Sequence, residues 1–156
     1  MNALAHHRHA ALRRIAGWLA AAYLMALALI ALWPTPVDRA AAGTITRILV
    51  FLHAHGVPQR LDYPLIEFTA NIALFVPVGL LGVLLMGRHR WLLAFLVGFI
   101  ASCAIEFGQL VLLPARVATP VDVMANTAGT ALGVLLALAL LAVVTARSST
   151  RPARQP

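Results

Sequence analysis

Residues 121–144 read VDVMANTAGTALGVLLALALLAVV, a stretch of 24 residues that carries one charged side chain, Asp122. A helix needs about 20 mostly apolar residues to cross the hydrocarbon core of a bilayer. The stretch is long enough and its charge lies at one end, so we expect a transmembrane helix here. Asp122 and Asn126 stand in its first turns, and the remainder is dominated by Leu, Ala, Val and Gly.

Three further stretches are similarly apolar, at residues 15–33, 68–86 and 91–113. Hydrophobic residues make up 62% of the chain and charged residues 11%, which is far more apolar than an average soluble domain. So much apolar surface cannot be buried in the core of a 156-residue chain and needs lipid as its solvent. We predict an all-α fold with a single domain over residues 1–146. Its transmembrane helices are expected at about 15–33, 66–86, 91–113 and 120–144.

The first apolar stretch has an alternative interpretation as a cleaved signal peptide, because Arg13 and Arg14 precede it. Its length and the membrane segments that follow it favour a membrane span. Trp18, Tyr23 and Trp33 include candidates for anchors at the membrane interface.

The segment between the first and second spans has its own pattern, with apolar residues at positions 45, 48, 49 and 52. This spacing predicts a helix, which is too short to cross a bilayer and should lie in the outer interface. Residues 147–156 are rich in Ser, Pro and Arg, and we expect a disordered tail there.

The basic residues indicate the orientation of the chain. All 12 are Arg, and they give a formal net charge of +7. Eight of them lie near the two termini or in the link at residues 88–90, which four spans would place on one side of the membrane. The other four lie on the opposite side. The positive-inside rule then predicts a bacterial inner-membrane protein with both termini in the cytoplasm. No basic stripe with interleaved aromatic residues is present, so we expect membrane lipids and not nucleic acid as the partner of this charge.

Polar side chains gather at the outer ends of three predicted spans and in the loop between the last two. The group consists of Glu67, Asn71, Glu106, Gln109, Arg116, Asp122 and Asn126. On a helical projection, Glu106 and Gln109 fall on the same face as Gly98 and Ser102, within about 80°. Small residues mark the contact faces of transmembrane helices. The polar side chains should therefore point into the bundle, away from lipid.

The last span shows the same arrangement of polar and small residues. Asp122 and Asn126 lie within about 60° of Gly129 and Gly133 on the projection. The two glycines have the spacing of a helix-contact motif. That motif could serve a neighbouring helix of the same chain or a second copy in a homo-oligomer.

A structural role explains much of this cluster. Thr119 has the position of a helix N-cap, with Pro120 after it and Asp122 three residues beyond the cap. The amides could serve as hydrogen-bonding links between helices, and Arg116 could neutralise Glu106 or Asp122.

A functional role is the other interpretation. Carboxylates, amides and one guanidinium at the outer face make a pocket for a polar head group, in which Arg116 could bind a phosphate or carboxylate. Glu106 and Asp122 are the candidates for catalytic acid or base. A metal held by His53, His55 and a carboxylate is a less favoured alternative, and we predict no metal and no cofactor.

The ordered set of motifs resembles the VanZ-like family. The motifs are NIALFVPVG at 71–79, EFGQ at 106–109, Arg116, and DVMANTAG at 122–129 followed by Gly133, together covering about half of the chain. The resemblance implies a small polytopic membrane protein of the bacterial envelope. The name-giving member of the family is associated with low-level resistance to the glycopeptide teicoplanin.

From these observations we expect a protein that binds a lipid or cell-wall precursor group in an outer-facing polar pocket. A lipid-linked cell-wall precursor or a glycopeptide would be its partner, with a link to antibiotic resistance. Two alternatives stay open at this point. One is a membrane enzyme acting on a lipid-linked substrate through carboxylate acid–base chemistry, which we favour less. The other is a structural or assembly subunit without a ligand.

Overall fold

The structure is a computed structural model that describes residues 2–33, 39–113 and 119–149. Within these ranges every regular element is a helix. The elements are α1 (Asn2–Ala31), α2 (Arg39–Ala54), α3 (Tyr63–Met86), the 3-10 helix η1 (Arg88–Arg90), α4 (Trp91–Leu112) and α5 (Pro120–Ser149). Four of them, α1, α3, α4 and α5, contain segments long and apolar enough to cross a membrane. The prediction of an all-α, multi-pass membrane bundle is confirmed.

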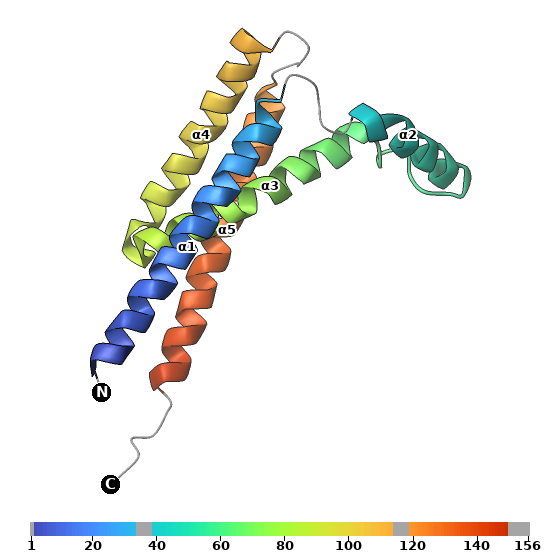
Figure 1. Ribbon diagram of the computed structural model, residues 1–156. Helices are drawn as coiled ribbons and strands as arrows, with labels where there is room; N and C mark the ends of the chain where they lie inside the picture. The colour runs from blue at the N-terminus through green and yellow to red at the C-terminus, as the bar shows by residue number, and fades with distance from the viewer. Residues whose placement is uncertain (1, 34–38, 114–118, 150–156) are drawn as a thin grey trace.

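The four long helices pack into one bundle with α3 at its centre. Helix α3 contacts α1, α4 and α5, and its contact with α5 is the most extensive of the three. Figure 1 shows the axes of α1, α4 and α5 roughly aligned, with α5 running opposite to α1 and α4, while α3 crosses them obliquely. The shorter helix α2 lies beside the start of α3, away from the other helices, and the start of α1 and the end of α5 point toward the same end of the bundle.

Several helix boundaries differ from the predicted ones. Helix α1 begins at Asn2 rather than at 15, although its membrane-length apolar segment is Arg14–Ala31. Helix α3 begins at Tyr63 rather than at 66, because Asp62 caps it by accepting the Leu65 N–H at 3.0 Å. An apolar run marks only the lipid-buried part of a helix, so it misses turns that extend beyond the run.

The end of α5 corrects a second prediction. The helix continues to Ser149, so residues 147–149 of the predicted disordered tail are helical. The rest of that tail, residues 150–156, lies outside the described residues.

Glycines bring α3 and α5 into backbone contact. A Cβ atom on Gly133 would collide with the carbonyl oxygen of Val76, and one on Gly129 would collide with the carbonyl oxygen of Ile72. From the opposite side, a Cβ on Gly79 would collide with the Thr130 carbonyl. Gly129 and Gly133 therefore serve a neighbouring helix of the same chain. The sequence also allowed these glycines to form a contact between two copies of the chain. Such a contact would have to use another face of the bundle.

Helix α1 is fixed to α3 near a proline. Helix α3 continues through Pro77, whose ring leaves the Ala73 carbonyl without a helical N–H partner. One residue along, the Leu74 carbonyl accepts a hydrogen bond from the Tyr23 hydroxyl at 2.5 Å. Tyr23, one of the three aromatic residues considered as an interfacial anchor, therefore makes a contact between helices.

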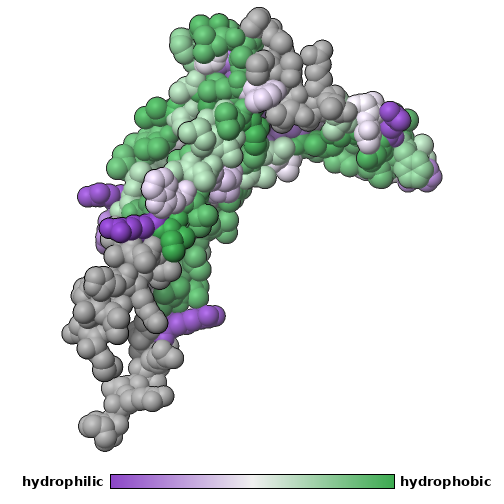
Figure 2. Space-filling model, viewed as in Figure 1, coloured by the Kyte–Doolittle hydropathy of each residue, from purple (hydrophilic) through white to green (hydrophobic). Residues whose placement is uncertain are grey.

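The bundle has apolar side chains outside and polar side chains inside. Figure 2 shows hydrophobic residues over most of the visible surface of the helices. On α4, Leu110 and Leu112 are each 70% exposed, whereas Ser102 is fully buried and Gln109 is 6% exposed. This pattern fits a protein whose outer surface is solvated by lipid.

Candidate functional site

The polar face of α4 is turned into the bundle. Its buried residues are Ala94, Gly98, Ser102, Glu106 and Gln109, which include the four that the helical projection placed on one face. Glu106 is 9% exposed. A carboxylate at this depth needs hydrogen-bonding partners, because an unpaired charge is expensive in a membrane.

Glu106 finds one partner at the start of α5. Its Oε2 accepts the backbone N–H of Thr119 at 3.0 Å. Thr119 is also the cap that the sequence predicted, because its hydroxyl oxygen accepts the Asp122 N–H at 3.2 Å. In a complete capping box the acid at Asp122 would accept the Thr119 N–H. Here the Glu106 carboxylate of α4 accepts the Thr119 N–H instead. The Asp122 carboxylate is therefore available for a different hydrogen bond.

Asp122 joins α5 to α3. Its Oδ1 accepts a hydrogen bond from Asn71 Nδ2 at 2.7 Å, and its Oδ2 accepts one from the Thr119 hydroxyl at 3.0 Å. Both carboxylate oxygens are thus engaged by donors from the protein. These two hydrogen bonds connect Asp122 to α3 and to the cap of α5.

Gln109 joins α4 to α1. Its Nε2 donates to the carbonyl oxygen of Ala31 at 2.8 Å. Ala31 is the last residue of α1, and carbonyl groups in the last turn of a helix lack intrahelical partners. The side chain of Gln109 therefore satisfies a helix end that would otherwise need water.

Asn126 is only partly satisfied. Its Nδ2 donates to Ser102 Oγ at 3.1 Å, but its Oδ1 is buried and has no hydrogen-bond partner. The side chain is 5% exposed. The hydroxyl of its neighbour Thr127 is also buried without a partner. Unsatisfied buried polar atoms are rare in native proteins and need an explanation.

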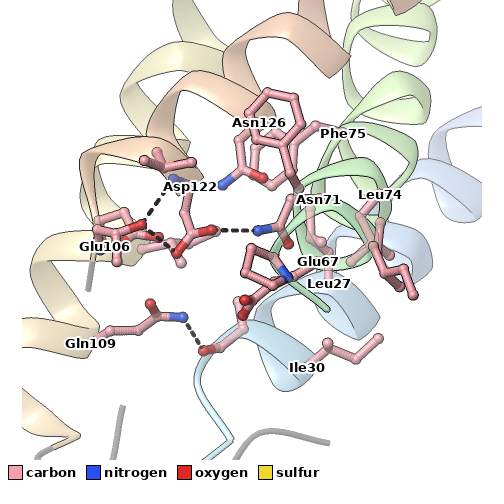
Figure 3. Close-up of a pocket in the computed structure, with 18 of the residues that line it drawn as sticks. Leu27, Ile30, Glu67, Asn71, Leu74, Phe75, Glu106, Gln109, Asp122 and Asn126 are labelled. Atoms are coloured by element: carbon pink, nitrogen blue, oxygen red, sulfur yellow. Dashed lines mark hydrogen bonds between the residues drawn. The ribbon is translucent and has the colours of Figure 1, made fainter. Parts of the chain in front are cut away.

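These side chains line one pocket of about 800 Å³, between the end of α1 and the starts of α3 and α5 (Figure 3). Six of the seven predicted site residues line it: Glu67, Asn71, Glu106, Gln109, Asp122 and Asn126. Glu67 differs from the others because its side chain is exposed. The seventh predicted residue, Arg116, lies outside the described residues.

A model of the family described as VanZ/LLP1 matches residues 19–143, which is most of the chain. The chain belongs to the VanZ-like family. The matched range includes residues 19–31 of α1, a helix that carries none of the family motifs. No curated protein and no solved structure matches the chain.

The motif residues of this VanZ-like protein are those that meet in space. Asn71 and Asp122, from different motifs, hydrogen bond to each other, and Gln109 contacts the end of α1. Gly129 and Gly133 allow the close approach of α3 and α5 that aligns the polar ends. The motif order along the chain therefore corresponds to one three-dimensional cluster.

The apolar side of the pocket was not predicted. It includes Leu27 and Ile30 from α1 and Leu74, Phe75 and Ile105 from α3 and α4. Ile45 of α2 and Tyr63 also contribute. Leucine and isoleucine in a membrane helix are too common to signal a site, so only the polar residues could be recognised from the sequence.

The described lining is acidic. Its charged residues are Glu67, Glu106 and Asp122, and all three are carboxylates. The described residues contain no group of three His, Cys, Asp or Glu side chains that could hold a metal ion. In α2 and after it, His53 Nε2 lies 3.0 Å from the Leu61 carbonyl oxygen, and His55 Nδ1 lies 2.7 Å from that of Phe51.

Proposed function

We propose that this VanZ-like membrane protein binds the polar head of a lipid or of a lipid-linked cell-wall precursor. The head would lie against Asn71, Glu106 and Asn126, at the outer side of the inner membrane. The apolar part of the ligand would lie along Leu27 and Ile30. The observation that carries the proposal is the pocket of about 800 Å³, which has carboxylates and amides on one side and aliphatic side chains on the other.

The size and composition of the pocket support this proposal. Ligand sites are typically clefts of about 300–1,000 Å³, lined mostly by apolar side chains with a few placed polar groups. A purely structural cluster needs only paired polar groups and would leave no such space.

Binding is favoured over acid–base catalysis by the hydrogen bonds of the two candidate catalytic residues. Asp122 has a donor on each carboxylate oxygen, and Glu106 holds the backbone N–H at the start of α5. Carboxylates with such partners are anchored in place and hold helices together. The link to teicoplanin-type resistance belongs to the same proposal, and it would follow only if the ligand is a cell-wall precursor or the glycopeptide itself.

Blocking the pocket tests the proposal. Ala70 and Ala73 are both exposed residues of α3, but only Ala70 lines the pocket. We expect Ala70→Trp to lose the lipid that copurifies with the wild-type protein in mild detergent, measured by mass spectrometry. The matched variant Ala73→Trp should keep it. Equal lipid content in both variants, or a wild-type protein that retains no lipid, would contradict the proposal.

A further inference from the structure

Two amide side chains in the pocket, those of Asn71 and Gln109, use only their NH2 groups within the protein. Gln109 Nε2 donates to the Ala31 carbonyl oxygen, and Asn71 Nδ2 donates to the Asp122 carboxylate. Because both partners are acceptors, they fix which end of each amide is the NH2 group. The other end is an oxygen, which can only accept. No described residue donates a hydrogen bond to either of these amide oxygens.

Both amide oxygens keep accessible surface. Asn71 and Gln109 line the pocket, and Figure 3 shows the Gln109 oxygen turned away from the hydrogen bond to α1. Among the described residues, the side-chain atoms that are fully buried without a partner are Asn126 Oδ1 and the Thr127 hydroxyl. Neither Gln109 Oε1 nor Asn71 Oδ1 is one of them, although the Gln109 side chain is only 6% exposed. A group in the pocket can therefore reach these two oxygens.

The hydrogen-bonding capacity of the two amides favours a hydroxyl as the ligand group. An amide NH2 group carries two donors, and Ala31 and Asp122 each take one. Each amide can therefore still both accept and donate. A hydroxyl matches this pair of roles, because it is a donor and an acceptor at once. An ammonium can only donate and an ionised phosphate oxygen can only accept, so each would use one half of the capacity.

Building on the proposed function, we infer that the pocket takes a lipid whose head group is a polyol, such as glycerol or a sugar. One hydroxyl donates to Gln109 Oε1 on the α4 side, and another donates to Asn71 Oδ1 on the α3 side. The apolar part of the lipid lies against Leu27 and Ile30.

The test uses the full chain in detergent with an equimolar mixture of phosphatidylglycerol, phosphatidylpropanol and phosphatidylethanolamine of identical acyl chains. Phosphatidylpropanol has the charge and the head-group carbon chain of phosphatidylglycerol but none of its hydroxyls. Bound lipid is identified by native mass spectrometry. We expect phosphatidylglycerol to exceed each of the others by at least about tenfold, the effect of two hydrogen bonds between neutral groups.

The other outcomes of this comparison separate the inference from the proposed function. Equal binding of phosphatidylpropanol would overturn the hydroxyl argument. Equal or stronger binding of phosphatidylethanolamine would overturn the choice of a hydroxyl over an ammonium. Either result would leave lipid binding intact, whereas no bound lipid at all would contradict the proposed function itself.

A second arm distinguishes a lipid from a soluble polyol. Millimolar glycerol carries the same hydroxyls without the acyl chains, and we expect it to displace little of the bound phosphatidylglycerol. Complete displacement would show that a soluble polyol is the ligand and would overturn the inference of a lipid.

Variants link the preference to the two amides. Gln109→Met and Asn71→Leu each replace one amide by an apolar side chain of similar size. We expect either change to lower the ratio of bound phosphatidylglycerol to phosphatidylpropanol at least about threefold, the effect of one hydrogen bond. Ser102→Ala also removes a hydrogen bond between α4 and α5, but Ser102 does not line the pocket, so this control should keep the ratio. An unchanged ratio in either amide variant would contradict the hydrogen bond assigned to it, and the wild-type lipid comparison decides the inference if neither variant folds.

Discussion

Single polar residues act as links between helices in this protein. Glu106 reaches the start of α5, Gln109 reaches the end of α1, and Asn71 reaches Asp122. Each link satisfies a polar group that lipid cannot hydrate. This end of the bundle is therefore held together by side chains of α3, α4 and α5 that link these helices to one another and to α1.

The link between Asn71 and Asp122 has a measurable energy. In a double-mutant cycle with Asn71→Ala and Asp122→Ala, we expect a coupling of about 0.6 kcal/mol, and at most about 1.7 kcal/mol, as for other hydrogen bonds within membranes. The free energy of unfolding in detergent would be measured. The control pair combines Asn71→Ala with Asp62→Ala, which removes the α3 cap and should show no coupling. Equal coupling in both cycles would contradict the assigned hydrogen bond.

Thr127 carries a buried hydroxyl without a partner, and its removal should not destabilise the fold. An unsatisfied buried polar group costs about 1–3 kcal/mol, so Thr127→Val should be neutral or stabilising by up to that amount. Thr130→Val is the matched change, because the Thr130 hydroxyl donates to the Asn126 carbonyl at 3.0 Å. We expect it to lower the thermal unfolding midpoint relative to Thr127→Val, and the opposite order would refute the account of both hydroxyls.

At the scale of elements, the approach of α3 to α5 depends on glycine. A Cβ at Gly133 would meet the Val76 carbonyl, and backbone atoms cannot move aside as side chains do. We expect Gly133→Ala to destabilise the bundle by about 1–3 kcal/mol or more, the cost of overpacking. The destabilisation would be measured as a lower thermal unfolding midpoint in detergent and a smaller folded fraction in size-exclusion chromatography.

Gly17 in α1 provides the matched control for Gly133. A Cβ there has nothing within 4 Å, so Gly17→Ala should be neutral or stabilising by up to about 1 kcal/mol through helix propensity. Similar losses in the two variants would mean that α3 and α5 do not pack through their glycines.

The sequence predicted much of this element structure, for physical reasons. Apolar runs located four spans, and helical spacing placed Ser102, Glu106 and Gln109 on one buried face. Helix ends were less accurate, because the Asp62 cap and the continuation of α5 to Ser149 lie outside the apolar runs. The sequence also did not predict that Glu106, and not Asp122, accepts the Thr119 N–H. This hydrogen bond depends on how closely α4 approaches α5, which no local sequence pattern indicates.

For the whole molecule, the positive-inside rule predicts which end faces the cytoplasm. In a Cys103→Ala background, Arg60→Cys lies after α2 and Arg88→Cys lies in η1, at the two opposite ends of α3. We expect an impermeant thiol reagent added to intact spheroplasts to label position 60 and to leave position 88 unlabelled until the membrane is lysed. Labelling of position 88 alone would invert the topology and place the pocket on the cytoplasmic side.

We propose that the polar head of a lipid or of a lipid-linked precursor occupies the pocket between α1, α3, α4 and α5. A crystal structure grown from a lipidic mesophase tests it directly. We predict continuous non-protein density from Asn71 and Glu106 to the aliphatic side chains of Leu27 and Ile30. A pocket closed by protein side chains, or one that holds only water, would contradict this proposal.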